Sequence, residues 1–199
     1  DHPQVALDMA MFMIDGVCAE LRDCLAARIA PPPVAIAVPA QVVVLDSFAD
    51  ELARVARACN VPANLLEIEV DDDADAAKFL SLRTLTAGLR EAGASLSLGK
   101  WGEGASPLAL LGALDVDSIT TASELMAAVP RDARACVVMA ALLDLLQALD
   151  TRVVVNGVGT AEQLAWLSRW PNALAQGLLF SRPKRGLAML LAPQHSPEA

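Results

Sequence analysis

Near its carboxyl end the chain reads Gln176-Gly177-Leu178-Leu179-Phe180-Ser181-Arg182-Pro183. The apolar run over 177–181 predicts the last strand of the fold, and residues 173–176 just before it offer a further strand candidate. Upstream, a capping-box pattern at 160–163 predicts the start of a helix. Before that helix, residues 152–155 are typical of a buried strand. The carboxyl end therefore predicts a strand–helix–strand unit.

The same alternation of strand and helix continues toward the amino end. Apolar residues recur every three or four positions and predict helices over 7–25, 48–59, 79–89 and 138–149. Shorter apolar or alternating runs predict strands over 34–38, 65–70, 95–98 and 116–119. Strands joined by helices are expected to be parallel, because a parallel connection needs a crossover. The chain is therefore expected to form an α/β fold with a parallel sheet of six strands, or seven if 173–176 is counted.

Composition excludes several classes of protein. The formal net charge is −9, which argues against nonspecific binding to DNA or RNA, because neutralising phosphates needs a basic surface. Although 55% of the residues are hydrophobic, no uncharged apolar stretch of about 18 residues occurs, so no membrane span is predicted in this segment. The four cysteines form no C-x-x-C pair, and both histidines lie in the tails, so the spacing of a zinc site is absent. Buried free thiols and a cytoplasmic location are expected.

Three segments carry a resemblance to a known family. Residues 176–183 resemble the QGYLFSRP signature of EAL-type cyclic-di-GMP phosphodiesterase domains, with one substitution. Residues 154–160, VVNGVGT, resemble the VAEGVET segment of that family, and residues 66–72, LEIEVDD, resemble LELEITE. The order and separation of the three segments also match, and the resemblance extends from about residue 7 to residue 183.

The resemblance implies a TIM-like (β/α) barrel of the EAL type that is incomplete at its amino end. The missing part is the strand that carries the Glu-Ala-Leu motif of the family, which occurs nowhere in this sequence. We expect one EAL-like barrel domain over residues 1–192, as the carboxyl-terminal part of a longer protein, and a flexible tail over 193–199.

The resemblance also implies a chemistry. EAL enzymes hydrolyse one phosphodiester bond of cyclic di-GMP with two metal ions, Mg²⁺ or Mn²⁺, held by oxygen ligands at the carboxyl ends of the strands. Two family site residues remain here, Glu69 and Gln176. The substituted positions are Ala37 for an Asn ligand, Gly99 and Lys100 for paired aspartates, Thr120 for a Lys, and Asn156 and Gly159 for two glutamates. One carboxylate and one amide do not hold two divalent cations, so no catalytic residue, metal site or cofactor is predicted.

Two groups of charges have more than one interpretation. Glu69 is expected to be held by a neighbouring partner, for which Lys100 is a candidate, because a buried carboxylate must be paired. The acidic run over 71–75 lacks the spacing of a calcium loop. A solvated loop that favours the amino end of the following helix is expected there instead.

These substitutions predict a domain that is not an enzyme and that acts as a regulatory or protein-interaction module in bacterial cyclic-di-GMP signalling. The alternative is a receptor domain that binds cyclic di-GMP without cleaving it, and the third interpretation is an active phosphodiesterase. The expected partners are another protein or neighbouring domains, with cyclic di-GMP as the second choice. The frequent pairing of domains in this family implies a homodimer.

Overall fold

The computed structural model describes residues 3–71, 83–103, 108–113 and 116–191. Its centre is a six-stranded sheet in which every neighbouring pair is parallel and the strands follow one another in sequence order. The strands are β1 (Val34–Ala37), β2 (Leu66–Asp71), β3 (Ser95–Trp101), β4 (Ser118–Thr121), β5 (Arg152–Val155) and β6 (Ala173–Ala175). The predicted α/β fold with a parallel sheet is confirmed.

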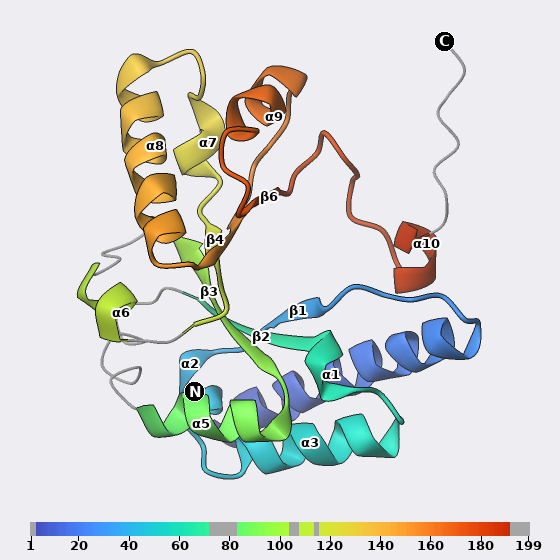
Figure 1. The fold of residues 1–199 in the computed structure, drawn as a ribbon. Coiled ribbons are helices and arrows are strands. Elements are labelled where there is room, and N and C mark those ends of the chain that lie inside the picture. Colours follow the sequence, from blue (N-terminus) through green and yellow to red (C-terminus); the bar gives the residue numbers. More distant parts are fainter. Residues whose placement is uncertain (1–2, 72–82, 104–107, 114–115, 192–199) are drawn as a thin grey trace.

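Helices connect the strands and lie around the sheet (Figure 1). In chain order they are α1 (Pro3–Ala26), α2 (Ala40–Val43), α3 (Phe48–Ala58), the short 3-10 helix η1 (Ala63–Leu65), α5 (Arg83–Ala92), α6 (Leu108–Ala113), α7 (Glu124–Ala127), α8 (Ala133–Ala148), α9 (Ala161–Leu167) and α10 (Leu187–Leu191). Helix α1 packs against α2, α3 and α10, so the last described helix lies beside the first.

Strands β1 and β6 form the two edges of the sheet. Among the described residues each pairs with one neighbour only, β1 with β2 and β6 with β5. The described strands therefore form an open parallel sheet rather than a closed barrel. No helix within the described ranges is long and apolar enough to cross a membrane.

One predicted strand is wrong. The apolar run over 177–181 forms a turn, and the last strand is the earlier candidate, Ala173–Ala175. The chain leaves the sheet after the Gln176 N–H donates to the Val155 carbonyl, and the turn is closed by a bond from the Phe180 N–H to the Gly177 carbonyl. The apolar side chains that suggested a buried strand are exposed instead, with Leu178 at 71% and Phe180 at 46%.

The two faces of the central strands differ in polarity. On β2, Leu66, Ile68 and Val70 are fully buried on the face that lies under the helices. Residues alternate between the faces of a strand, so Glu67 and Glu69 lie on the opposite, inner face. Among the buried polar residues are Ser97 of β3 and Ser118 of β4. The core is therefore aliphatic outside the sheet and polar inside it.

The predicted capping box at the start of α9 is confirmed. Thr160 accepts from the Gln163 N–H, and the Gln163 side chain accepts from the Thr160 N–H in return. The side-chain amide of Gln163 is buried and also donates to the carbonyls of Met126 and Val129. One glutamine thus caps α9 and ties it to the segment that follows β4.

The cysteines are all free thiols, and Cys18 is fully buried on α1. Burial raises the pKa of the Cys18 thiol to about 11, and the neighbouring Cys59 and Asp15 act in the same direction. Each of these surroundings disfavours the thiolate, so the folded chain holds the Cys18 proton more tightly than the unfolded chain does.

We expect the free energy of unfolding to fall as the pH rises from about 9 toward about 11. Above the ordinary thiol pKa the unfolded chain has released this proton while the folded chain still holds it, so the contribution to stability is lost as the pH approaches the folded pKa. Urea unfolding at about pH 8 and about pH 10.5 measures the change. The same comparison on Cys18→Ala should show a smaller loss, and an equal loss in both proteins would contradict the assignment to Cys18.

Candidate functional site

The carboxyl ends of the strands gather most of the predicted site residues at one edge. Because the six strands are parallel, residues at their ends share a register: Ala37 pairs with Glu69, and Glu69 pairs with Ser97. Asn156 follows β5 directly, and Gln176 follows β6 directly. Thr120 on β4 and Gly99 on β3 complete this edge.

Two of the predicted site residues have a different setting. Gly159 lies in the loop before α9, where its N–H donates to the Gln163 side chain, so it takes part in the helix cap as well as in the loop. Lys100 lies where the pairing of β3 with β4 shifts register, has a positive φ of 50° and is exposed. The acidic residues at 72, 73 and 75 lie outside the described residues.

Glu69 has a partner that the sequence did not suggest. The Thr120 hydroxyl donates to Glu69 Oε2 at 2.6 Å, across the intervening strand β3. No ion pair between Glu69 and Lys100 occurs in the part of the chain that the structure describes, so the proposed lysine partner is replaced by a hydroxyl. The bond is charge-assisted, because its acceptor is a carboxylate.

A second bond of the same kind lies one layer deeper. The Ser118 hydroxyl donates to Glu67 Oε1 at 2.6 Å, and Arg152 Nη2 lies 3.6 Å from Glu67 Oε2. Sequence analysis missed this network, although Glu67 stands two positions before Glu69 and Ser118 stands two positions before Thr120. A period of two puts such residues on the same face of their strands, so the pattern was available.

Small residues on β3 allow the side chains of β2 and β4 to bond to each other over the strand between them. Ser97 lies on the strand between β2 and β4, is fully buried, and its hydroxyl has no hydrogen-bond partner among the described residues. Gly99, further along the same strand, has no side chain at all. A larger residue at either position would occupy the space that the carboxylates cross.

We expect Ser118→Ala to lower the free energy of unfolding by about 1–3 kcal/mol, because it leaves a buried carboxylate oxygen without its donor. Ser123→Ala is the matched control, since its hydroxyl bonds to Glu124 at the surface and its loss should change stability by less than about 0.5 kcal/mol. Urea unfolding of the two variants measures the difference, and equal stabilities would show that the buried bond contributes nothing.

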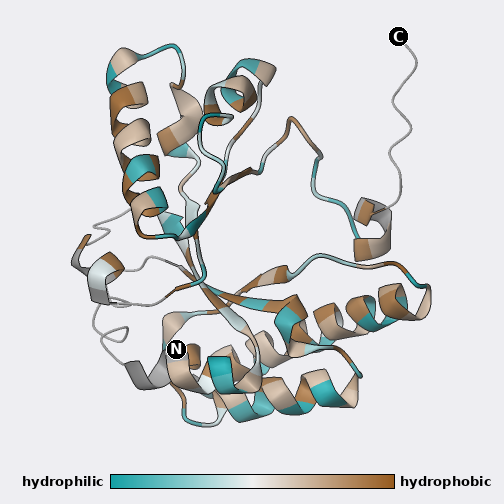
Figure 2. Cartoon of the chain, viewed as in Figure 1, coloured by the Kyte–Doolittle hydropathy of each residue, from teal (hydrophilic) through white to brown (hydrophobic). Residues whose placement is uncertain are grey.

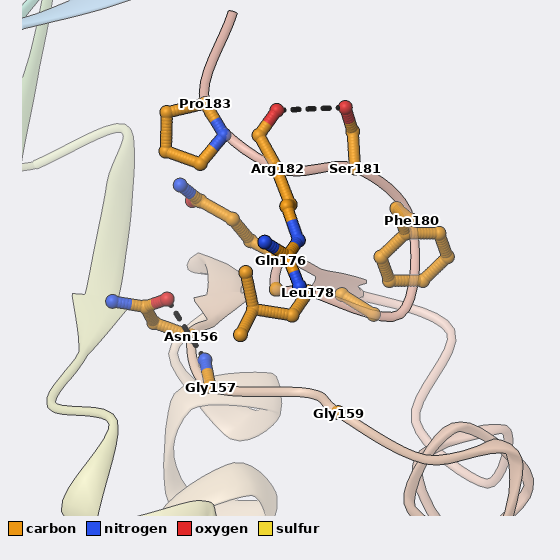
Figure 3. A pocket seen from close by; sticks show the side chains of 11 residues that line it. Asn156, Gly157, Gly159, Gln176, Leu178, Phe180, Ser181, Arg182 and Pro183 are labelled. Carbon is orange, nitrogen blue, oxygen red and sulfur yellow. Dashed lines mark hydrogen bonds between the residues drawn. The ribbon is translucent and has the colours of Figure 1, made fainter.

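A pocket of about 610 Å³ opens beside β5 and β6 at the same edge (Figure 3). The loops after the two strands line it, and its residues are Asn156, Gly157, Gly159, Ala175, Gln176, Gly177, Leu178, Phe180, Ser181, Arg182 and Pro183. This volume lies within the range of about 300–1,000 Å³ that is usual for small-molecule sites. Figure 3 shows the Arg182 side chain extending from its loop back toward Leu178.

Backbone geometry fixes the pocket walls. A Cβ on Gly177 would lie 2.2 Å from the Val158 carbonyl oxygen, so only glycine allows this close approach of the two loops. Gly157 has φ +85°, and its N–H donates to the Asn156 side-chain oxygen at 2.8 Å. The pocket thus has a preformed wall in which Asn156 Oδ1 is already engaged.

The oxygen atoms of the described residues at this edge do not fit a two-metal centre. Mg²⁺ and similar cations take about six oxygen ligands, mostly carboxylates. Among the described residues no three His, Cys, Asp or Glu side chains converge on one point. Glu69 Oε2 and Asn156 Oδ1 already accept hydrogen bonds, so few oxygens remain. No reaction step through a metal is therefore derived.

Comparison with known proteins gives the family. The model of the EAL domain matches residues 2–183. The chain belongs to the EAL domain family. Cyclic di-GMP phosphodiesterase NbdA of Pseudomonas aeruginosa is 35% identical over 137 residues, which are 69% of this chain and 18% of NbdA. The chain thus spans less than a fifth of the length of that relative.

Solved structures of the family share the fold. The EAL domain of Mycobacterium smegmatis DcpA has a TM-score of 0.81 and 25% identity, over 94% of this chain and 84% of that one. The PaMucR phosphodiesterase, solved in complex with cyclic di-GMP, has a TM-score of 0.79 and 21% identity, over 90% of this chain and 73% of that one. The TIM-like architecture expected from the resemblance is thereby confirmed, in a form truncated relative to a full EAL domain.

The prediction that the EAL chain is not an enzyme is wrong. Its relative NbdA is named as a cyclic di-GMP phosphodiesterase, and a solved structure of the same fold is a phosphodiesterase. The prediction assumed that the functional side chain of each family position can come only from that position. The carboxyl edge of such a fold collects side chains from many strand ends and loops, so a substitution at one position does not by itself remove a chemistry.

Proposed function

We propose that this EAL domain binds cyclic di-GMP in the pocket beside β5 and β6 and acts through it in bacterial cyclic-di-GMP signalling. The observation that carries the proposal is that one preformed pocket is lined by both a guanidinium, Arg182, and an exposed aromatic ring, Phe180. The family membership and the complex of a fold relative with cyclic di-GMP support the choice of ligand.

The chemistry of the pocket suits a cyclic dinucleotide. A guanidinium binds phosphate oxygens through paired N–H donors, and Arg182 is the arginine among the lining residues. An aromatic face stacks on a nucleobase, which Phe180 offers at 46% exposure. The amides of Gln176 and Asn156 add donors at the strand ends. The site therefore has groups for both the phosphate and the base.

The oxygen donors at the site point to binding without a metal cofactor. One carboxylate, Glu69, already accepts a hydrogen bond, and Asn156 and Gln176 at the ends of β5 and β6 contribute amides to the pocket. In this proposal Glu69 and Gln176 remain from the family site, and recognition of the ligand depends on Arg182 and Phe180.

Calorimetric titration of the 199-residue chain with cyclic di-GMP tests the proposal. We expect Arg182→Ala to weaken binding about 10–100-fold, because it removes a charge-assisted contact to phosphate. Arg185→Ala is the matched control, an exposed arginine of the same segment that does not line the pocket. Affinity in EDTA should equal affinity in Mg²⁺ or Mn²⁺.

No heat of binding at high micromolar ligand would contradict the proposal, and so would equal losses for Arg182→Ala and Arg185→Ala. Chromatography of the same samples follows any cleavage of the dinucleotide, so recognition and hydrolysis are read separately.

We also propose that a strand preceding residue 1 pairs with the free edge of β1 and carries the Glu-Ala-Leu motif of the family. An apolar groove of about 490 Å³ lies beside β1 and is lined partly by Phe12, Met13 and Val17. The Val38 N–H donates to the backbone carbonyl of Glu69 on β2, so the N–H groups of Ala35 and Ala37 face the open edge.

In a chain extended at its amino end, the amides of Ala35 and Ala37 should exchange hydrogen more slowly than in the 199-residue chain, because they become paired. Hydrogen-exchange NMR measures this, with the already paired amide of Val38 as the internal control. Unchanged exchange at Ala35 and Ala37 would contradict the pairing.

A second role, protein interaction within the same signalling, is favoured by one observation. The outer face of α8 is apolar and exposed, with Val137 at 68% and Val138 at 51%. The free thiols and the family context support a cytoplasmic location for both roles.

A further inference from the structure

Gln163 is a buried residue whose side-chain amide uses all of its hydrogen-bonding groups. The residue is 7% exposed. Its Oε1 accepts from the N–H groups of Gly159 at 2.8 Å and Thr160 at 3.1 Å. Its Nε2 donates to the carbonyls of Met126 at 2.9 Å and Val129 at 3.2 Å. A primary amide has two N–H donors and two lone pairs on its oxygen, so every one of them is engaged.

The capping box accounts for only half of these bonds. It needs the oxygen of Gln163, and an ionised glutamate in the same place would supply that acceptor as well. The two donated bonds go to a different segment, which begins in α7 and runs toward α8. An ionised glutamate would lose both of them. The donor half of the amide therefore has a role that capping does not explain.

The surroundings of the donor half are apolar. The two residues that accept its bonds, Met126 and Val129, belong to the buried hydrophobic core. Figure 2 shows hydrophobic residues along most of α8, the helix that packs against α7. Polar groups in such surroundings are costly without a hydrogen bond, so the bonds from Gln163 hold the two segments together firmly.

The backbone that Gln163 holds is one wall of the nucleotide pocket. We call residues 156–160 the wall loop, since three of them line that pocket. The wall loop rests on the segment after β4, where a Cβ on Gly157 would lie 3.0 Å from the Ser123 carbonyl oxygen. Gln163 bonds to the wall loop through its oxygen and to the segment after β4 through its nitrogen. It thus sets how the wall loop lies on its support.

The wall loop in turn holds the loop that carries Arg182. The Val158 N–H donates to the Gln176 carbonyl at 3.0 Å, and the Leu179 N–H donates to the Val158 carbonyl at 3.2 Å. Both bonds join the wall loop to residues 176–183, which form the other wall of the pocket. A shift of the wall loop would therefore also move the loop of the guanidinium.

We propose that Gln163 is a positioning residue for the nucleotide pocket. Its two donated hydrogen bonds fix the wall loop, and through it the loop of Arg182, in the form that binds the ligand. Gln163 stands outside the lining residues, so it acts through the backbone and not by contact with the ligand. The inference rests on the function proposed above for this pocket.

Three variants separate the two halves of the amide. Gln163→Glu keeps an oxygen acceptor for the cap and removes the donors, and Gln163→Met removes both. Thr160→Ala is the matched control, because it destabilises the start of α9 but leaves the side-chain bonds of Gln163 and the lining residues in place. It measures what a loss of stability alone does to binding.

Calorimetric titration of the 199-residue variants with cyclic di-GMP tests the positioning. We expect Gln163→Glu and Gln163→Met to weaken binding about 5–30-fold, since each loses the bonds that hold the wall loop. Thr160→Ala should stay within about twofold of the unsubstituted chain. If Gln163→Met fails to fold by circular dichroism, Gln163→Glu carries the comparison, because it retains the cap.

The pH profile of Gln163→Glu distinguishes positioning from a loss of stability. Protonation of the introduced carboxyl restores one O–H donor, so the affinity of this variant should recover between about pH 8 and about pH 5, relative to the unsubstituted chain at the same pH. Gln163→Met introduces no group that titrates, so its relative affinity should stay constant over this range.

Hydrogen-exchange NMR follows the two loops without ligand. We expect the amides of Val158 and Leu179, which join the loops, to exchange at least about 10-fold faster in Gln163→Glu and Gln163→Met. The amide of Val153, which donates to the Asn172 carbonyl at the start of β5, is the internal control and should not change.

Unchanged exchange at Val158 and Leu179 in both Gln163 variants overturns the inference. An equal loss of affinity in Thr160→Ala also overturns it, and so does a deficit of Gln163→Glu that is the same at every pH. If the unsubstituted chain does not bind cyclic di-GMP, the proposed function fails, and the exchange rates then decide by themselves whether Gln163 holds the two loops.

Discussion

The hydrogen bonds that cross β3 inside the sheet constrain the rest of the structure. Glu67 and Glu69 project from β2, and their carboxylates reach the hydroxyls of Ser118 and Thr120 on β4. A carboxylate on the inner face needs such donors, because an unpaired charge shielded from water is costly. The bonds form only if β2, β3 and β4 keep one register and β3 offers small side chains between them. Register, strand order and the polarity of the interior are thus linked.

That polar interior determines where ligands can bind. Parallel strands present their carboxyl ends at one edge, and the edge here brings the Glu69 carboxylate together with the Thr120 hydroxyl and the amides of Asn156 and Gln176. The hydrogen bond from Thr120 engages Glu69, so recognition shifts to the loops after β5 and β6. Those loops approach so closely that only glycine fits at position 177, and this packing holds Arg182 and Phe180 around a common pocket.

The helical layer was more predictable than the loops. Helices α1, α3 and α8 could be predicted because apolar residues recur at helical spacing, and the α9 capping box because both of its partners are local in sequence. The strand predicted over 177–181 was wrong, since an apolar run looks the same in a buried strand and in an exposed turn. The strand ends earlier because the chain turns away at Gly177 after the Gln176 N–H has bonded to the Val155 carbonyl, and Val155 and Gln176 are distant in sequence.

The sequence alone determined the alternation of strands and helices, the parallel sheet and the family signature at residues 176–183, because these depend on periodicity and short motifs. The family resemblance, carried by short motifs, also named residues that lie at the strand ends. Only the tertiary structure decided the partner of Glu69, the buried pair of Glu67 and Ser118, and the exposure of the outer face of α8. Each of these depends on which side chains meet across β3 or remain uncovered by a neighbour, and such contacts join positions that are far apart in the chain.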